Sequence, residues 1–196
     1  MDWQKGKVVS RPEFIRLVAK YVNKIKRVTT FLVVHHTDRP NYADWDRKPD
    51  GEYWFRVIDK AHKLRGWKGF GYHVLILPDG NFVLGRHPEE VGAHVSGYNR
   101  ASLGIACLGN FNKGHDIPMR PEQYISFKYG MAALLFFCAL TEAERANLPF
   151  ISRLKFHREL NETDCPGSGL DKQYFVNIVL PRLLPDVKRM LKECSE

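Results

Sequence analysis

The sequence has no run of apolar residues long enough to span a membrane. Its N-terminal residues, Met1 to Lys7, contain neither the apolar core nor the small-residue cleavage site of a secretory signal. Internal repeats, low-complexity tracts and flexible linkers are also missing. We therefore expect no membrane insertion, and synthesis in the cytoplasm. With 196 residues, 44% hydrophobic and 27% charged, the chain is expected to form one globular domain with a sizeable core.

Acidic residues are outnumbered by basic ones, 22 against 30, and the formal net charge is +8. Such an excess favours an anionic partner through long-range attraction. The basic residues form no dense tract, however, and none of the usual nucleic-acid-binding motifs is present. We interpret the basic clusters as solvated surface and expect no nucleic-acid partner.

Cysteine is scarce, with four residues, and a chain of this size does not need a disulfide framework. Cys107 and Cys138 lie in apolar runs and are interpreted as small core residues, while Cys194 is close to the C-terminal end. Only Cys165 has neighbours of chemical interest, because a histidine lies eight positions before it and a Pro-Gly turn follows.

Hydrophobic periodicity divides the chain into helices and strands. Residues 12–26 have an apolar face at helical spacing, and Ser10 with Glu13 predicts a capping box before them. Residues 28–36 are apolar on both faces, which predicts a central strand. The other predicted elements are a helix at 52–64, a hairpin of 72–77 and 81–84, strands at 102–109 and 152–156, a helix from 121 to about 146, and a helical segment at 172–191 interrupted by Pro181 and Pro185.

Alternating helices and strands with one hairpin predict an α/β fold: a single domain with a central mixed β-sheet flanked by helices. Within it, residues 1–27 are predicted to be a helical extension that packs on the main domain, residues 28–196.

Two adjacent histidines, His35 and His36, end the predicted central strand. Successive strand side chains point to opposite faces, so only one of the two can join a given site directly. The pair is either a source of one metal ligand or simply the polar start of a loop.

A second group is His157 with Cys165, which can converge if the intervening loop folds back. A histidine and a cysteine make half of a zinc site, and His35 is a candidate third ligand. Two imidazoles and a thiolate would leave the fourth position open, as in catalytic zinc sites. A cysteine nucleophile with a histidine base is the competing chemistry, and the residues alone leave both open.

A third group is Gly71-Tyr72-His73, which begins the predicted hairpin. A glycine before a strand permits close backbone approach and places Tyr72 at the start of that strand. The same residues could also do no more than begin the hairpin.

Taken together, these groups resemble the type 2 N-acetylmuramoyl-L-alanine amidases. This family includes phage lysins of the T7 lysozyme kind, AmpD-like recycling amidases and animal peptidoglycan recognition proteins. The resemblance runs from about Val28 to Leu184, with its motifs in the family's order. The motifs are Val33-Val34-His35-His36-Thr37, Gly71-Tyr72-His73, Gly92-Ala93-His94, Ser102-Leu103-Gly104-Ile105 with Gly109-Asn110-Phe111, and His157 with Thr163-Asp164-Cys165-Pro166-Gly167.

The resemblance implies a zinc enzyme that hydrolyses the amide bond between the muramic-acid lactyl group and L-alanine in peptidoglycan or muropeptides. It implies that His35, His157 and Cys165 hold Zn²⁺, and that Tyr72 stands beside the water that zinc activates. It further implies that His94, with His36 and Asn110, binds the substrate.

Thr163 departs from the lysine that lysins and recycling amidases of the family usually carry, and matches the threonine of amidase-type recognition proteins. The change removes a fixed cation, and it leaves Thr163 as a weaker catalytic hydrogen-bond donor. The main alternative function is a peptidoglycan-binding recognition protein without turnover. The presence of Cys165 argues against it, because inactive recognition proteins typically lack that cysteine. Lack of a signal sequence fits a phage endolysin or a cytoplasmic recycling enzyme.

Overall fold

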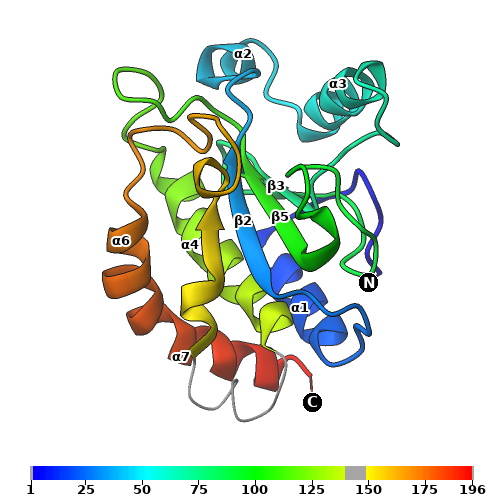
Figure 1. Ribbon diagram of the computed structural model, residues 1–196, viewed down its shortest axis with the longest axis vertical. Helices are drawn as coiled ribbons and strands as arrows, with labels where there is room; N and C mark the ends of the chain where they lie inside the picture. Colours follow the sequence, from blue (N-terminus) through cyan, green and yellow to red (C-terminus); the bar gives the residue numbers. More distant parts are fainter. Residues whose placement is uncertain (1, 140–148, 196) are drawn as a thin grey trace.

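A mixed six-stranded sheet forms the centre of the protein in the computed structural model, which describes residues 2–139 and 149–195 (Figure 1). The chain order of the strands is β1 (Val8–Val9), β2 (Phe31–His36), β3 (Val74–Ile76), β4 (Phe82–Leu84), β5 (Ser102–Cys107) and β6 (Leu154–Phe156). In the sheet the order is β1-β4-β3-β5-β2-β6. Strands β3, β5, β2 and β6 run parallel, whereas β4 is antiparallel to both β3 and β1. The predicted α/β fold with a mixed sheet is therefore confirmed.

Helices cover both faces of the sheet. Helices α1 (Arg11–Val22), α4 (Pro121–Leu135) and α7 (Leu180–Glu193) pack against one another and build the larger core on one face. Helix α3 (Gly51–Leu64) lies on the other side, after the short α2 (Tyr42–Arg47) (Figure 1). The strands supply alternate residues to the two cores, for example Ile105 to the first and Ala106 to the second. Within the described residues, no helix has the length and apolar character needed to cross a membrane.

The predicted capping signal and turn are present. The Glu13 carboxylate accepts hydrogen bonds from the Ser10 N–H at 2.8 Å and from the Ser10 hydroxyl at 2.6 Å, at the start of α1. Gly80 has a φ of +86°, which a side chain would strain, in the turn that joins β3 to β4. Local chemistry of these residues is therefore enough to place both features.

Several element boundaries differ from the prediction. Helix α4 ends at Leu135 and continues only as a 3-10 turn, Phe136–Cys138, so the predicted helix is too long. Its last predicted part, from residue 140, lies outside the described residues. Residues 149–153 form a 3-10 turn instead of beginning the last strand. The pattern also missed β1 and α2, because elements of two and six residues are too short to show periodicity.

The C-terminal segment stays helical through both prolines. It begins as α6 (Lys172–Tyr174), passes through a π-helical turn at Phe175–Val179 and continues as α7. Pro181 lies in the first turn of α7, where its missing N–H is tolerated, and Pro185 lies inside the helix. The predicted interruption thus takes the form of a π turn before Pro181. Four buried residues, Leu180, Leu184, Val187 and Leu191, hold α7 against the core.

Candidate metal centre

The site begins at the carboxyl end of β2, where His35 and His36 leave the strand on opposite faces. The His35 ring turns towards Tyr72 and His94, and 2% of the residue is exposed. The His36 ring turns towards Phe111, whose N–H donates to His36 Nδ1 at 3.2 Å. Because successive strand side chains alternate, only His35 of this pair faces the site, while His36 accepts a hydrogen bond from the neighbouring loop.

Strand pairing brings His157 to His35. Strand β6 runs parallel to β2 and ends at Phe156, so the residue after it reaches the same edge of the sheet as the end of β2. The ring centroids of His35 and His157 are 4.5 Å apart, although 122 positions separate the two residues in the sequence. The parallel register of the two strands is thus what assembles the pair.

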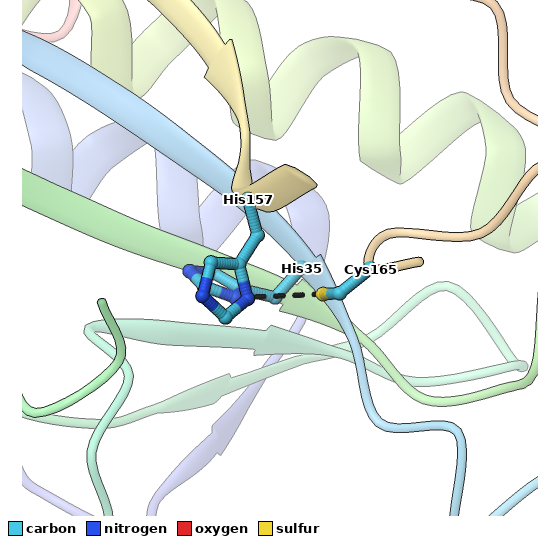
Figure 2. Close-up of side chains that lie close together, drawn as sticks. All are labelled: His35, His157 and Cys165. Carbon is cyan, nitrogen blue, oxygen red and sulfur yellow. Dashed lines mark hydrogen bonds between the residues drawn. The ribbon is translucent and has the colours of Figure 1, made fainter. Parts of the chain in front are cut away.

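Cys165 completes the group from the loop after His157 (Figure 2). The Arg158 N–H donates to the Cys165 carbonyl at 2.8 Å, which folds the loop back onto its own start. Cys165 Sγ lies 3.6 Å from His35 Nδ1 and accepts a hydrogen bond from the His36 N–H at 3.4 Å. The structure thus brings together the three predicted ligand residues.

The arrangement fits a zinc ion. One ligand atom from each of His35, His157 and Cys165 lies within 4.8 Å of the other two. Tetrahedral zinc, with Zn–S near 2.3 Å and Zn–N near 2.0–2.1 Å, would separate a sulfur and a nitrogen ligand by about 3.6 Å. That separation matches the distance from His35 Nδ1 to Cys165 Sγ. Three protein ligands of this type leave one position open, as catalytic zinc sites do.

Burial favours the neutral forms of these groups in the protein without metal. Desolvation lowers the pKa of His35 well below its ordinary value and also lowers that of His157. The same effect raises the pKa of the Cys165 thiol to about 12. Neutral imidazole is the form that binds a metal, and a thiol gives up its proton when a metal binds it.

Tyr72 lies beside His35, with 5.3 Å between the ring centroids. Its ring packs edge-on against His62 at 5.4 Å and Phe70 at 5.7 Å. Burial raises the pKa of Tyr72, so the side chain remains a phenol that can donate a hydrogen bond. A cavity of about 290 Å³ adjoins it, and its lining includes Trp54, Arg65 and Tyr72. The tyrosine therefore stands between the candidate metal centre and a space open to a ligand.

The other predicted site residues occupy three different settings. Thr163 is exposed, and its Oγ1 accepts a hydrogen bond from the Cys165 N–H at 3.2 Å. The Asn110 side chain donates to Asp38 Oδ1 at 2.7 Å and accepts from the Asn112 N–H at 3.0 Å. His94 is 5% exposed, and its Nδ1 lies 3.0 Å from His35 Nε2. Direct substrate contact by Asn110 and His94, as by His36, stays a prediction.

Two residues with roles at this site were not singled out in the sequence. Asn161 Oδ1 lies 3.1 Å from His157 Nε2, and the spacing of four residues is a signal that could have revealed it. Arg158 donates to the carbonyls of Gly167 at 2.8 Å and Leu170 at 2.9 Å, and so holds the cysteine loop. Arg158 has no comparable signal, because its partners lie in the loop that follows its 3-10 turn and depend on how that loop folds.

Fold and site define a single-domain α/β protein with a candidate catalytic metal centre of two histidines and one cysteine at the carboxyl ends of parallel strands. The family model described as N-acetylmuramoyl-L-alanine amidase matches residues 25–168. The chain belongs to this family, and the resemblance seen in the motifs is confirmed.

Relatives of two kinds match the chain. Peptidoglycan-recognition protein LB of Drosophila melanogaster is 27% identical over 84% of this chain, which spans 66% of that protein's length. The endolysin of Escherichia phage T7 is 32% identical over 66% of this chain and 80% of its own. Among solved structures, the endolysin N-acetylmuramoyl-L-alanine amidase LysCS of Clostridium intestinale is 32% identical, with a TM-score of 0.55 over 75% of this chain and 80% of that one. The endolysin and the amidase among these relatives support an amidase activity on peptidoglycan.

Proposed function

We propose that this protein is a zinc-dependent amidase that cleaves the amide bond between the muramic-acid lactyl group and L-alanine in peptidoglycan or its soluble fragments. The observation that carries the proposal is the convergence of His35, His157 and Cys165, with the sulfur-to-nitrogen distance of a tetrahedral zinc site. The amidases among the relatives supply the reaction class. We propose peptidoglycan or its fragments as the substrate, and we expect no nucleic-acid partner.

When bound, zinc would supply Lewis-acid activation of a water molecule and of the substrate carbonyl. The chain's own contribution is to hold the ligands and to provide hydrogen bonds around the reacting carbonyl. Tyr72 offers a phenol O–H beside the centre, which in this proposal donates to the oxygen that gains negative charge. The Thr163 hydroxyl accepts from the Cys165 N–H and keeps its own O–H free to act as a second, neutral donor.

The cavity beside Tyr72 gives the substrate a place to lie next to the centre. Its lining combines the Trp54 ring with the Arg65 guanidinium, and Arg65 also lies over the ring of Trp67 at 5.7 Å. Arg39 and Asp44 also line this cavity. An aromatic surface with two arginines nearby suits a flexible chain that carries a carboxylate. We therefore assign the groups that flank the scissile bond to this cavity.

A cysteine peptidase is disfavoured by the surroundings of Cys165. A nucleophilic cysteine needs a lowered pKa, usually beside a cation or a helix N-terminus. Here burial raises the pKa of Cys165, and 8% of the residue is exposed. Such a thiol is suited to a metal rather than to attack on a carbonyl.

A binding protein without turnover is the second candidate, favoured by the similarity to a peptidoglycan-recognition protein. One experiment separates the two. The purified, zinc-loaded protein is incubated with a defined muramoyl-pentapeptide, with and without a chelator, and the products are identified by mass spectrometry. We expect a free peptide with N-terminal alanine, lost on chelation and restored by zinc. Tight binding of intact substrate without any cleavage would overturn the amidase and leave the recognition protein.

A further inference from the structure

Both candidate imidazole ligands have a hydrogen-bonding partner at the same ring atom, Nε2. His157 Nε2 lies 3.1 Å from Asn161 Oδ1, and His35 Nε2 lies 3.0 Å from His94 Nδ1. An amide oxygen can only accept, so His157 carries its proton on Nε2 and has a bare Nδ1. Asn161 therefore selects one tautomer of its histidine.

The tautomer of His35 is selected in the same way, by the imidazole of His94. Its Nδ1 is the atom 3.6 Å from Cys165 Sγ, so Nδ1 is the atom that faces the metal centre. A ligating Nδ1 has no proton, which leaves Nε2–H to donate to His94 Nδ1. His94 then holds its own proton on Nε2, a buried atom without a hydrogen-bond partner among the described residues.

The position of the His94 ring is set by two glycines. A Cβ added to Gly104 would lie 2.7 Å from His94 Cγ and Cδ2, and one added to Gly92 would lie 2.4 Å from Cδ2. The imidazole thus lies against two glycine backbones, and a side chain at either position would collide with it. The Asn99 side chain accepts hydrogen bonds from the N–H groups of His94 at 2.8 Å and Val95 at 3.0 Å, which holds the loop as well.

His94 is almost fully enclosed by its neighbours. Only 5% of the residue is exposed, and its ring packs edge-on against those of His35 at 5.0 Å and His73 at 5.7 Å. The contact that His94 makes with the candidate centre is therefore the one to the His35 imidazole.

We propose that His94 and Asn161 are positioning residues, which hold His35 and His157 in the Nε2–H tautomer so that both Nδ1 atoms face the metal. The proposal rests on the zinc site described under the proposed function. Partners of this kind typically change metal affinity by about 10- to 100-fold when they are removed.

Matched pairs of variants test the proposal. His94→Leu removes the acceptor at a similar volume, whereas His94→Asn puts an amide oxygen close to the position of Nδ1. Asn161→Leu removes the other acceptor, and Asn161→Asp keeps it. Zinc affinity is measured by competition with a chelating dye, and thermal unfolding without metal verifies that each variant folds. Long-range ¹H–¹⁵N correlation spectra of the metal-free protein report the tautomers of His35 and His157.

We expect each leucine variant to bind zinc about 10- to 100-fold more weakly and to lose the single Nε2–H tautomer of its histidine. The conservative variants should recover most of both signals, which a merely structural role would not produce. Folded leucine variants with affinities within about twofold of the wild type, and unchanged tautomers, would overturn the inference. If the wild type binds no zinc while the tautomers respond as stated, the zinc function fails and the positioning role stands.

Discussion

Cys165 is the one sulfur in the candidate centre; it is buried, and its Sγ is held by the His36 N–H at 3.4 Å. Cys194 is exposed and lies outside this group, so it provides a matched control. The contrast between the two cysteines isolates metal ligation from general thiol chemistry.

Cys165→Ser should weaken zinc binding strongly and abolish turnover, because a hydroxyl is a poorer zinc ligand than a thiolate. Cys194→Ser should bind zinc and cleave muropeptide as the wild type does. Zinc content after dialysis and the rate of peptide release measure both effects. Full activity of the Cys165 variant without bound metal would contradict the zinc mechanism.

Tyr72 contributes at the same scale, through a single hydroxyl. Its ring is held between His62 and His35, so removal of the oxygen should leave the ring in place. Tyr72→Phe should therefore retain zinc while the rate falls by about a hundredfold, the size of one lost transition-state donor. Steady-state kinetics with metal analysis check this, and an unchanged rate would remove Tyr72 from the chemistry.

At the scale of elements, the segment between β4 and β5 carries His94 and is tied to the N-terminal part of the chain by Arg27. The partly buried guanidinium donates to backbone carbonyls in that segment and at the start of β5, and its Nη1 also lies 3.3 Å from His73 Nε2. The carbonyls are those of Pro88 at 2.9 Å, Asn99 at 2.8 Å, Arg100 at 3.2 Å and Ser102 at 2.7 Å. A planar fork can reach several acceptors at once, whereas a lysine presents one nitrogen.

Arg27→Met should lower the free energy of unfolding by about 1–3 kcal/mol, because carbonyls lose their donor. Arg27→Lys should recover little of that loss. The neighbouring Lys26→Met should change stability by no more than about 0.5 kcal/mol, since the Lys26 side chain is exposed. Urea unfolding of the metal-free proteins measures the three values. A lysine variant as stable as the wild type would show that the fork geometry is not required.

For the whole molecule, buried neutral histidines make stability depend on pH. His73 accepts a hydrogen bond from the Gly104 N–H at 2.9 Å, and His62 accepts one from the Gly71 N–H at 3.0 Å. Burial lowers the pKa of His73 to about 3 and that of His62 to about 4. Neither residue belongs to the candidate metal ligands, so the effect should appear in the protein without zinc.

The direction in which stability changes with pH follows from the number of protons that each state binds. Between the two folded values and the ordinary pKa near 6.5, the unfolded chain binds more protons than the folded one. The stability that these neutral histidines confer is complete above pH 6.5 and is lost as pH falls towards 4. We expect these two histidines alone to lower the unfolding free energy of chelator-treated protein by on the order of 2–4 kcal/mol from pH 7 to pH 5, and the lowered pKa values of His35, His94 and His157 act in the same direction. Equal or greater stability at pH 5 in urea titrations would contradict this.

Much of the fold follows from local patterns. The helical face of residues 12–26 and the capping pair Ser10 and Glu13 predict α1 to within a few residues. The branched run that ends in His35 and His36 predicts the central strand β2, and the sheet order places it between β5 and β6. These patterns involve only a few neighbouring residues, so they can be recognised in the sequence.

Other features exist only because distant segments meet. Strand β1 forms because Val8 and Val9 find β4 as a partner, and the two residues alone carry no strand signal. In the sequence, Arg27 looks like one more surface cation. In the structure, its guanidinium donates to carbonyls in the segment from Pro88 to Ser102. In each case the partner is more than fifty positions away in the sequence.

The sequence by itself determined the fold class, the family and the three residues that converge, because hydrophobic periodicity and the order of motifs can be seen in the sequence alone. Only the tertiary structure decided which face each histidine takes and what each ring nitrogen contacts. His94 illustrates this, since its motif suggested a groove and its contacts place it against His35 Nε2. The physical reason is that propensity and period are properties of neighbours in the chain, whereas hydrogen-bond partners and burial depend on how the sheet and its loops pack.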